Sequence, residues 1–425
     1  MTTTAVPDTS GPITDAATAD GDQGRAVPRF DSAVRIGSSE LAELIAYLGA
    51  DVVARDADNR HPFAEFEVLR AARLGALRLP IDQGGGGATL PELFETVIAL
   101  GEADPNIAHS IRNHLNFTES LLRESDGPDA RWLDEVRAGK LFGNSSTELS
   151  NKRAGRRNQD FESAVTRSDD GLRLNGIKFY STGNLYADYL VVAVSGPDGK
   201  PARVVVPATR PGIVVEQDWD GIGQRFTGSG TTRYVDVAVT EDEFLSNGTY
   251  YGDLPYSATF PQLYLTAVIA GILRRVTTDA ADLVRTKQRT FYHAVEGHPV
   301  DDPILQQTVG TLASTAYAAE ALVLSAAQAL SEAYAAHGST DEAELSLRAA
   351  SRSAKAKVVV DELALRAAGE LFDVGGGTAA RRSSHLDRHW RNIRTLAAHN
   401  PRTYKAKAIG ANELTGEPLP TGAFF

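Results

Sequence analysis

Two groups of residues in this sequence have types and spacing suited to chemistry, and the first is His109 with Asn113. They are spaced i, i+4 in a helical stretch, so their side chains share one face of the helix. An imidazole and an amide on one face can line a binding site, although such a pair is more often packed or at the surface. With no HExxH motif and no carboxylate placed to complete a metal triad, we expect no metal site.

The second group is the one basic concentration of the chain, residues 381–407. It contains eight Lys or Arg residues, a single acid at Asp387, and the histidines His385, His389 and His399. Two interpretations fit this pattern. One is a helix that is solvated on one face or salt-bridged across a subunit interface, and the other is a cradle for a cofactor phosphate.

Glycine-rich stretches do not supply a nucleotide loop. The run Gly84 to Gly87 lacks the spacing of a phosphate-binding loop, and neither 221–223 nor 228–230 completes a dinucleotide fingerprint. The chain also has no cysteine, which excludes disulfides, thiolate metal sites and thiol redox chemistry. Any redox chemistry therefore needs a bound cofactor, and its reducing equivalents must come from another source.

Composition and net charge limit the classes of partner that we expect for this protein. The chain has 425 residues, 42% of them hydrophobic, and a net charge of −12, which repels a phosphate backbone. We therefore expect no nucleic-acid partner. No run of 18 apolar residues and no signal pattern is present, so we expect no membrane association and a cytoplasmic location.

The elements that position these residues change in type twice along the chain. We expect a disordered leader over residues 1–29 and a helical domain over 30–140, in which Thr89 and Glu92 form a capping box. Short β-branched runs separated by turns over 141–250 predict an antiparallel barrel or sandwich. Long Ala- and Leu-rich stretches over 251–411 predict a helical bundle, followed by a tail over 412–425. The predicted fold class is mainly α with a central β domain.

This order of regions, together with several local motifs, resembles the acyl-CoA dehydrogenase superfamily over roughly residues 35–410. Residues 174–183 read LNGIKFYSTG, similar to the family's LNGxKxWITNG strand. Residues 76–104, 223–237, 289–291 and 375–377 are similar to four further family motifs. The resemblance implies an N-terminal helical domain, a middle β-barrel and a C-terminal four-helix bundle.

The resemblance also implies flavin-binding residues. Phe179 takes the aromatic position beside the isoalloxazine, Ser181 the hydroxyl that hydrogen-bonds flavin N5, and Tyr180 lies between them. Arg289, Gly376 and Gly377 correspond to positions that reach the flavin phosphate or its extension across a dimer interface. A homotetramer built as a dimer of dimers is therefore expected.

One departure from the family pattern concerns the catalytic base. Residues 391–400 align with RDxRIxxIYEGT, so the dehydrogenase glutamate falls on Asn400, and an amide cannot abstract an α-proton. The other family branch carries its base early in the first bundle helix, but residues 260–271 contain no Asp or Glu. Instead, His399, Asn400 and Pro401 with Tyr404 and Lys405 resemble the flavin monooxygenases of this fold, such as dibenzothiophene sulfur oxygenases and indole oxygenases.

That branch implies a two-component monooxygenase. FMN arrives as FMNH2 from a separate NAD(P)H-dependent flavin reductase, reacts with O2, and oxygenates a sulfur, nitrogen or aromatic carbon of a small substrate through a C4a-hydroperoxyflavin. His399, Ser181 and Asn144 are the expected catalytic residues, since an imidazole near its pKa can donate a proton and regain it.

Further expected roles and alternatives complete this interpretation. Asn144, Ser145 and Thr147 are expected to contact the flavin, whereas His109 and Asn113 fall where these oxygenases line the substrate pocket. The alternatives are an acyl-CoA dehydrogenase that uses FAD, which is the less favoured flavin, and a non-catalytic DNA-binding relative.

Overall fold

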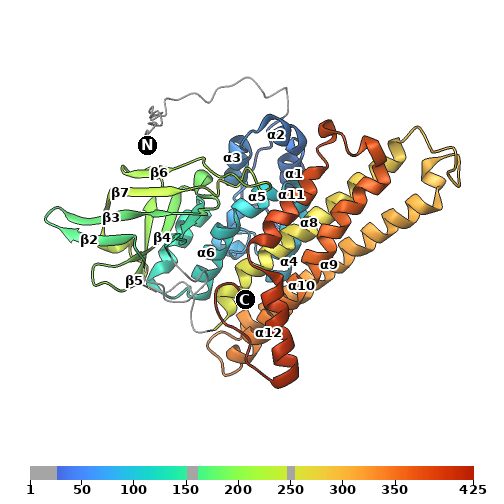
Figure 1. Cartoon of the computed structure of the whole chain (residues 1–425). Helices are drawn as coiled ribbons and strands as arrows, with labels where there is room; N and C mark the ends of the chain where they lie inside the picture. Colours follow the sequence, from blue (N-terminus) through green and yellow to red (C-terminus); the bar gives the residue numbers. More distant parts are fainter. Residues whose placement is uncertain (1–25, 151–160, 247–253) are drawn as a thin grey trace, which may run out of the picture.

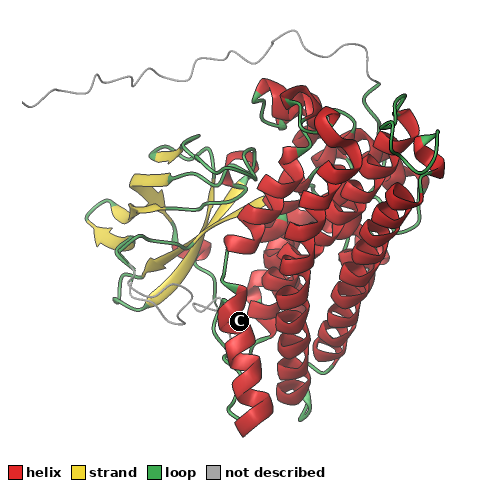
Figure 2. Ribbon diagram, turned by 45° about the vertical axis from the view of Figure 1, so that its right-hand side comes forward, coloured by secondary structure: helices red, strands yellow, loops and turns green. Residues whose placement is uncertain are grey.

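The computed structural model describes residues 26–150, 161–246 and 254–425. Helices come first, a curled sheet follows, and five further helices complete the described chain (Figure 1). Figure 2 shows the helices gathered on one side and the sheet on the other. This order confirms the predicted fold class.

The N-terminal helices are short. They are α1 (Ser39–Gly49), α2 (Val52–Asp58), α3 (Phe63–Ala71), α4 (Leu90–Ala103), α5 (Pro105–Ser110), α6 (Arg112–Arg123) and α7 (Trp132–Arg137). The predicted capping box is present at α4, where the Glu92 carboxylate accepts from the Thr89 N–H at 2.8 Å. The apolar face of α4 includes Phe94, which packs against Phe260 and Tyr264, so the first and last helical regions share one core.

The sheet has seven strands: β1 (Phe142–Ser145), β2 (Ala164–Ser168), β3 (Gly171–Lys178), β4 (Tyr189–Ser195), β5 (Pro201–Pro207), β6 (Ile213–Val215) and β7 (Thr232–Val239). Most pairs are antiparallel, with Leu172 of β3 opposite Val239 of β7 and Leu190 of β4 opposite Val206 of β5. Val and Leu side chains from these strands form a separate core.

The prediction of an antiparallel barrel was wrong in one respect, because two strand pairs are parallel. β1 runs parallel to β4, with Phe142 opposite Tyr189, and β2 meets the end of β4 in the same direction. A parallel pair needs a long crossover, and the chain between β1 and β4 supplies one that includes β2 and β3. The sheet is therefore mixed and curled.

The last region contains three long helices, α8 (Tyr256–Thr286), α9 (Pro303–Ala335) and α10 (Glu342–Gly375), followed by α11 (Asp387–Ala398) and α12 (Arg402–Thr415). α12 continues past the expected boundary at 411. After Gly416 the chain folds back on the bundle, and Ala423 and Phe425 are buried.

Two helices, α8 and α9, are long and apolar enough to cross a membrane by length and composition. The apolar window of α8 is 94% buried among its neighbours, whereas that of α9 is 33% buried. Burial in the bundle accounts for the apolar character of α8 without a membrane.

Candidate active site

Four of the expected site residues, His109, Asn113, Ser181 and His399, lie where four segments converge. These segments are the junction of α5 and α6, the turn at 179–183, the loop at 222–230 and the end of α11. We call the residues that meet there the junction site: His109, Arg112, Asn113, Ser181, Gln224 and His399.

The break between α5 and α6 lies against the turn that contains Ser181. Asp104 caps the start of α5, where its carboxylate accepts from the N–H of Asn106, and α5 ends at Ser110. Across this break, Asn113 Nδ2 donates to the carbonyl of Thr182 at 2.9 Å. The helix junction is therefore tied to the residue after Ser181.

Ser181 lies in a tight turn after β3. Its N–H donates to the carbonyl of Gly230 at 3.1 Å, while its hydroxyl is buried and has no hydrogen-bond partner in the described chain. Gly183 has a φ of +86°, and a Cβ there would lie 2.2 Å from the carbonyl oxygen of Ser110, so only glycine fits. The close approach holds the Ser181 hydroxyl beside α5 and α6.

His109 is buried, and its Nδ1 lies 3.1 Å from Gln224 Oε1. Burial, and then the charge of Arg112, lower the pKa of His109 to about 3, so the ring is neutral near pH 7. The amide oxygen can only accept, so the proton is on Nδ1 and Nε2 is an acceptor. Because Nε2 is buried without a partner in the described chain, it can accept a hydrogen bond from a ligand.

His399 lies at the end of α11, and its side chain is partly open to solvent. Arg112 Nη1 lies 3.5 Å from its Nε2, and a guanidinium can only donate, which favours the tautomer with the proton on Nδ1. Burial, and then Arg112, hold the pKa of His399 well below its usual range. With its pKa lowered, His399 offers a neutral N–H at Nδ1, and its catalytic role stays a prediction.

Asn400, on which the dehydrogenase glutamate falls, is in direct contact with Gln262 near the start of α8. Asn400 Nδ2 donates to Oε1 of Gln262 from the start of α8, and both residues are buried. Both side chains are amides, which are not basic near neutral pH. Neither position can remove an α-proton.

Thr147, two residues after β1, is joined to the turn that carries Ser181. The Phe179 N–H donates to the Thr147 carbonyl at 2.9 Å, and Asn144 Oδ1 accepts from the hydroxyl of Ser146 at 3.1 Å. Tyr180, at a φ of +54°, is exposed, and its ring lies 6.1 Å from that of Trp219.

Ser145 faces the other way. Its hydroxyl accepts from Asn184 Nδ2 at 2.7 Å and from the Tyr234 hydroxyl at 2.8 Å. These bonds hold its side chain inside the β region, so a contact from this hydroxyl to a flavin is not evident.

The structure does not bring Arg289, Gly376 and Gly377 to the junction site. Arg289 is exposed after the end of α8, and the two glycines follow α10. Lys287 Nζ lies 3.4 Å from the carbonyl of Val374, so these two segments are neighbours. In the described chain no hydrogen bond, ion pair or ring contact joins Arg289 to another residue.

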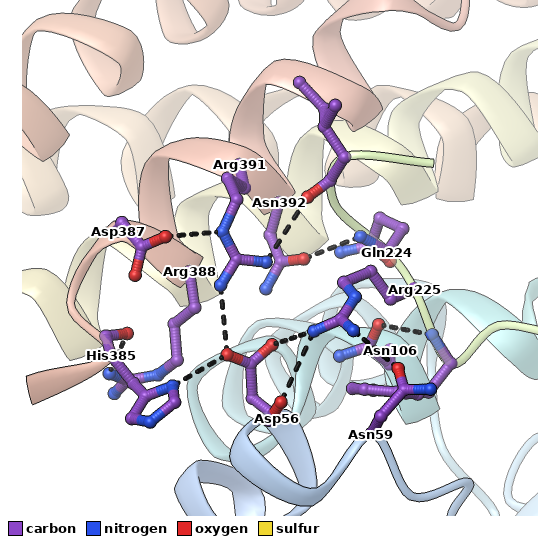
Figure 3. A network of polar contacts seen from close by, with 12 residues as sticks. Asp56, Asn59, Asn106, Gln224, Arg225, His385, Asp387, Arg388, Arg391 and Asn392 are labelled. Atoms are coloured by element: carbon purple, nitrogen blue, oxygen red, sulfur yellow. Dashed lines mark hydrogen bonds and ion pairs between the residues drawn. The ribbon is translucent and has the colours of Figure 1, made fainter. Parts of the chain in front are cut away.

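Most of the basic segment at 381–407 is paired within the chain. Asp56 of α2 accepts from Arg391 at 3.0 Å, from His385 at 3.2 Å and from Arg225 at 3.4 Å (Figure 3). Further pairs join Arg388 to Asp279 and Arg402 to Glu362. These salt bridges lie within the chain, so they are not the bridges across a subunit interface that the sequence suggested.

The same network leads into the junction site. Asn392 Oδ1 accepts from the Gln224 N–H at 2.7 Å, and Asn106 Oδ1 accepts from the Phe226 N–H at 3.2 Å. Gly223 packs so closely that a Cβ would lie 2.1 Å from the carbonyl oxygen of Arg391. α5 and α11 therefore hold the loop that presents Gln224 to His109.

Sequence reasoning missed Arg112 and Gln224 as site residues. Arg112 is three residues after His109, a helical spacing that could have identified it. Gln224 lies in a stretch that resembled the family, but nothing in the sequence paired it with His109. That pairing depends on a contact between distant segments.

The chain is similar to known flavoproteins over most of its length. Residues 263–402 match the family described as acyl-CoA dehydrogenase, C-terminal domain. Dibenzothiophene monooxygenase of Mycolicibacterium goodii is 29% identical over 398 residues, which cover 88% of this chain and 92% of that protein. The probable FMNH2-dependent monooxygenase SfnC of Pseudomonas putida is 27% identical, covering 90% and 95%. The crystal structure of FMN-bound TdsC from Paenibacillus sp. A11-2 superposes with a TM-score of 0.81 at 28% identity, covering 90% and 98%.

Proposed function

From the premise that the chain has the acyl-CoA dehydrogenase fold and that its relatives are monooxygenases, we propose that it is a two-component, FMN-dependent monooxygenase. The observation that carries this proposal is the contact between Asn400 and Gln262 beside His399. An amide stands where the dehydrogenase glutamate falls, residues 260–271 contain no Asp or Glu, and the exposed imidazole of His399 directly precedes Asn400. The site is suited to hydrogen bonding and proton transfer rather than to α-proton abstraction.

The residues of the site fit FMN. A flavin ring needs planar apolar contacts and a few polar groups at its edge. Phe179 is half-buried, and the buried hydroxyl of Ser181 lacks a partner in the described chain. Phe179 and Tyr180 would contact the ring, Ser181 its N5 edge, and Asn144 and Thr147 the neighbouring edge, whereas Ser145 supports the strand from behind. Bound as FMNH2, the cofactor supplies the electrons and the carbon at which O2 is activated.

His399 would hold a proton at Nδ1 and present it to the developing negative charge on oxygen. Arg112 donates to its Nε2 and so orients the ring. Negative charge beside His399 raises its pKa, so the imidazole takes up a proton more readily when the anionic reduced cofactor is present. His109 and Asn113 lie on the helix junction at the substrate side, where the bare Nε2 of His109 accepts a hydrogen bond from substrate.

The proposal includes partners. A flavin reductase that uses NAD(P)H delivers FMNH2, O2 is the second substrate, and a small organic molecule is oxygenated at sulfur, nitrogen or aromatic carbon. We place the enzyme in the cytoplasm as a homotetramer. Exposed Arg289, Gly377, Phe291 and Tyr292 at the end of α8 and α10 support a subunit contact there, with Phe291 67% and Tyr292 101% exposed.

The test couples the purified protein to a flavin reductase with NADH, FMN and isotope-labelled O2. Candidate sulfur and nitrogen heterocycles are screened by mass spectrometry for one added labelled oxygen atom. Incorporation that requires both the protein and FMN supports the proposal. Tightly bound FAD that is bleached by an acyl-CoA, with no oxygen incorporation, would establish the dehydrogenase alternative instead.

A further inference from the structure

Residues 416–425 form a strap that folds back onto the bundle. Ala423 and Phe425 are buried, and the Phe425 ring packs in a small cluster with Ala350 and Ala354 of α10. Between them, the side chain of Phe424 is 37% exposed. The strap therefore buries the ring of Phe425 and leaves the ring of Phe424 partly exposed.

Two buried side chains fix the backbone on either side of this ring. Gln262 Nε2 donates to the carbonyl of Ala423 at 2.8 Å, and Lys405 Nζ donates to the carbonyl of Phe424 at 2.8 Å. The other end of the Gln262 amide accepts from Asn400, the residue after His399. The position of the strap is thus linked to the site through one amide.

The ring of Phe424 meets His399 directly. Their centroids are 5.4 Å apart and the rings are inclined by 76°, an edge-to-face contact. Both residues remain partly exposed, so the protein leaves part of each ring open. The backbone hydrogen bonds hold Phe424 in place, and its ring lies partly open beside the imidazole of His399. This ring therefore has apolar surface available for a ligand.

We propose that Phe424 is a specificity-determining residue that forms the apolar wall of the substrate site at His399. This rests on the proposed monooxygenase function. The ring contacts the apolar part of the substrate, and it also limits access of water to His399, which reduces the loss of activated oxygen as hydrogen peroxide.

The experiment compares the full chain with Phe424→Ala and Phe424→Trp. Leu414→Ala is the matched control, because Leu414 is an apolar residue of α12 that is 86% exposed. The first readout is labelling of His399 by diethylpyrocarbonate, located by peptide mass spectrometry, which requires no flavin chemistry. We expect several-fold faster labelling of His399 in Phe424→Ala, slower labelling in Phe424→Trp and no change in Leu414→Ala.

The second readout is hydrogen peroxide release after reduced FMN and protein are mixed with O2 without substrate. We expect release to be about tenfold faster in Phe424→Ala, while the Kd for FMN and the melting temperature stay at wild-type values. Labelling and peroxide release equal to those of Leu414→Ala overturn the proposal, as does a Phe424→Ala defect confined to FMN binding. If His399 labelling responds to Phe424 but the wild type never slows peroxide release relative to free FMNH2, the proposed function fails while the placement of Phe424 at His399 stands.

Discussion

The polar network around Asp56 and the junction site are neighbours, but they differ in whether their polar groups have partners. The carboxylate of Asp56 is fully paired, whereas several buried polar atoms of the junction site have no partner in the described chain. Asp56 is bonded to the guanidinium groups of Arg391 and Arg225 and to the imidazole of His385 (Figure 3). Burial by itself would raise its pKa, but Arg391, His385 and Arg225 outweigh burial and lower it. In the junction site, by contrast, Ser181 Oγ, His109 Nε2 and Gln224 Nε2 are buried without partners in the described chain.

This difference distinguishes groups that hold the fold from groups that await a ligand. A buried polar atom without a partner costs about 1–3 kcal/mol, so a fold retains several only where something else satisfies them. Substitutions in the Asp56 network should therefore lower stability, whereas substitutions in the junction site should lower activity.

The largest effect is expected for His399→Ala. Loss of the imidazole should reduce oxygenation about a hundredfold or more, because a positioned proton donor is lost, while the melting temperature stays unchanged. The counterpart on the same helix is His389→Ala, since His389 Nε2 is bound to Asp279 at 2.7 Å. That variant should lose stability instead. Reductase-coupled turnover and thermal melting measure both, and the comparison fails if the two variants behave alike.

Asp56→Ala should give the next largest effect, on stability. Removing the carboxylate leaves Arg391, His385 and Arg225 without their common partner and should lower the free energy of unfolding by about 3 kcal/mol. Asp387→Ala is the control, because Asp387 also binds Arg391 but is 60% exposed, and it should cost less than about 1 kcal/mol. Urea unfolding of the two variants measures the difference; equal losses would contradict a structural role specific to Asp56.

The buried side chain of Lys405 should make the stability of the protein depend on pH. Burial, and then the charge of Lys357, lower its pKa from 10.5 to about 7. Above that pH the unfolded chain binds one more proton than the folded one, so the contribution of Lys405 to the free energy of unfolding rises with pH until the unfolded lysine also titrates. Relative to Lys405→Met, wild-type stability should rise by about 2–3 kcal/mol from about pH 7 to about pH 9.

Urea unfolding at the two pH values tests this change. Lys355→Met is the control, since Lys355 is half-exposed and pairs with Glu413. A pH dependence of Lys405→Met equal to that of the wild type would show that Lys405 is not buried in this way.

The smallest effects are expected from two serines for which the sequence predicted flavin contacts. Ser181→Ala should raise the Kd for FMN about tenfold and leave stability unchanged, because the lost hydroxyl has no partner in the described chain. Ser145→Ala should lower stability by about 1–2 kcal/mol, because Asn184 and Tyr234 lose their acceptor, with little effect on FMN. Flavin fluorescence titration and urea unfolding separate the two, and reversed results would exchange their roles.

Local signals in the sequence were sufficient to predict much of the fold. The Thr89 capping box and the change from helical to β-branched patterning are properties of neighbouring residues, and both are present. The parallel pairing of β1 with β4 was not predictable, because it depends on a crossover and not on either strand. Likewise, Phe424 reaches His399 only because the strap folds back, and no pattern in residues 416–425 indicates that return.

The central claim is that His399 protects oxygen activation on bound FMN. Stopped-flow absorbance tests it directly, by mixing anaerobically reduced FMN and protein with oxygenated buffer, for the wild type and His399→Ala. We predict a transient spectrum distinct from reduced and oxidised FMN in the wild type, and its loss or shortening in His399→Ala. Reoxidation at the rate of free FMNH2 in both proteins, with no transient, would contradict the account.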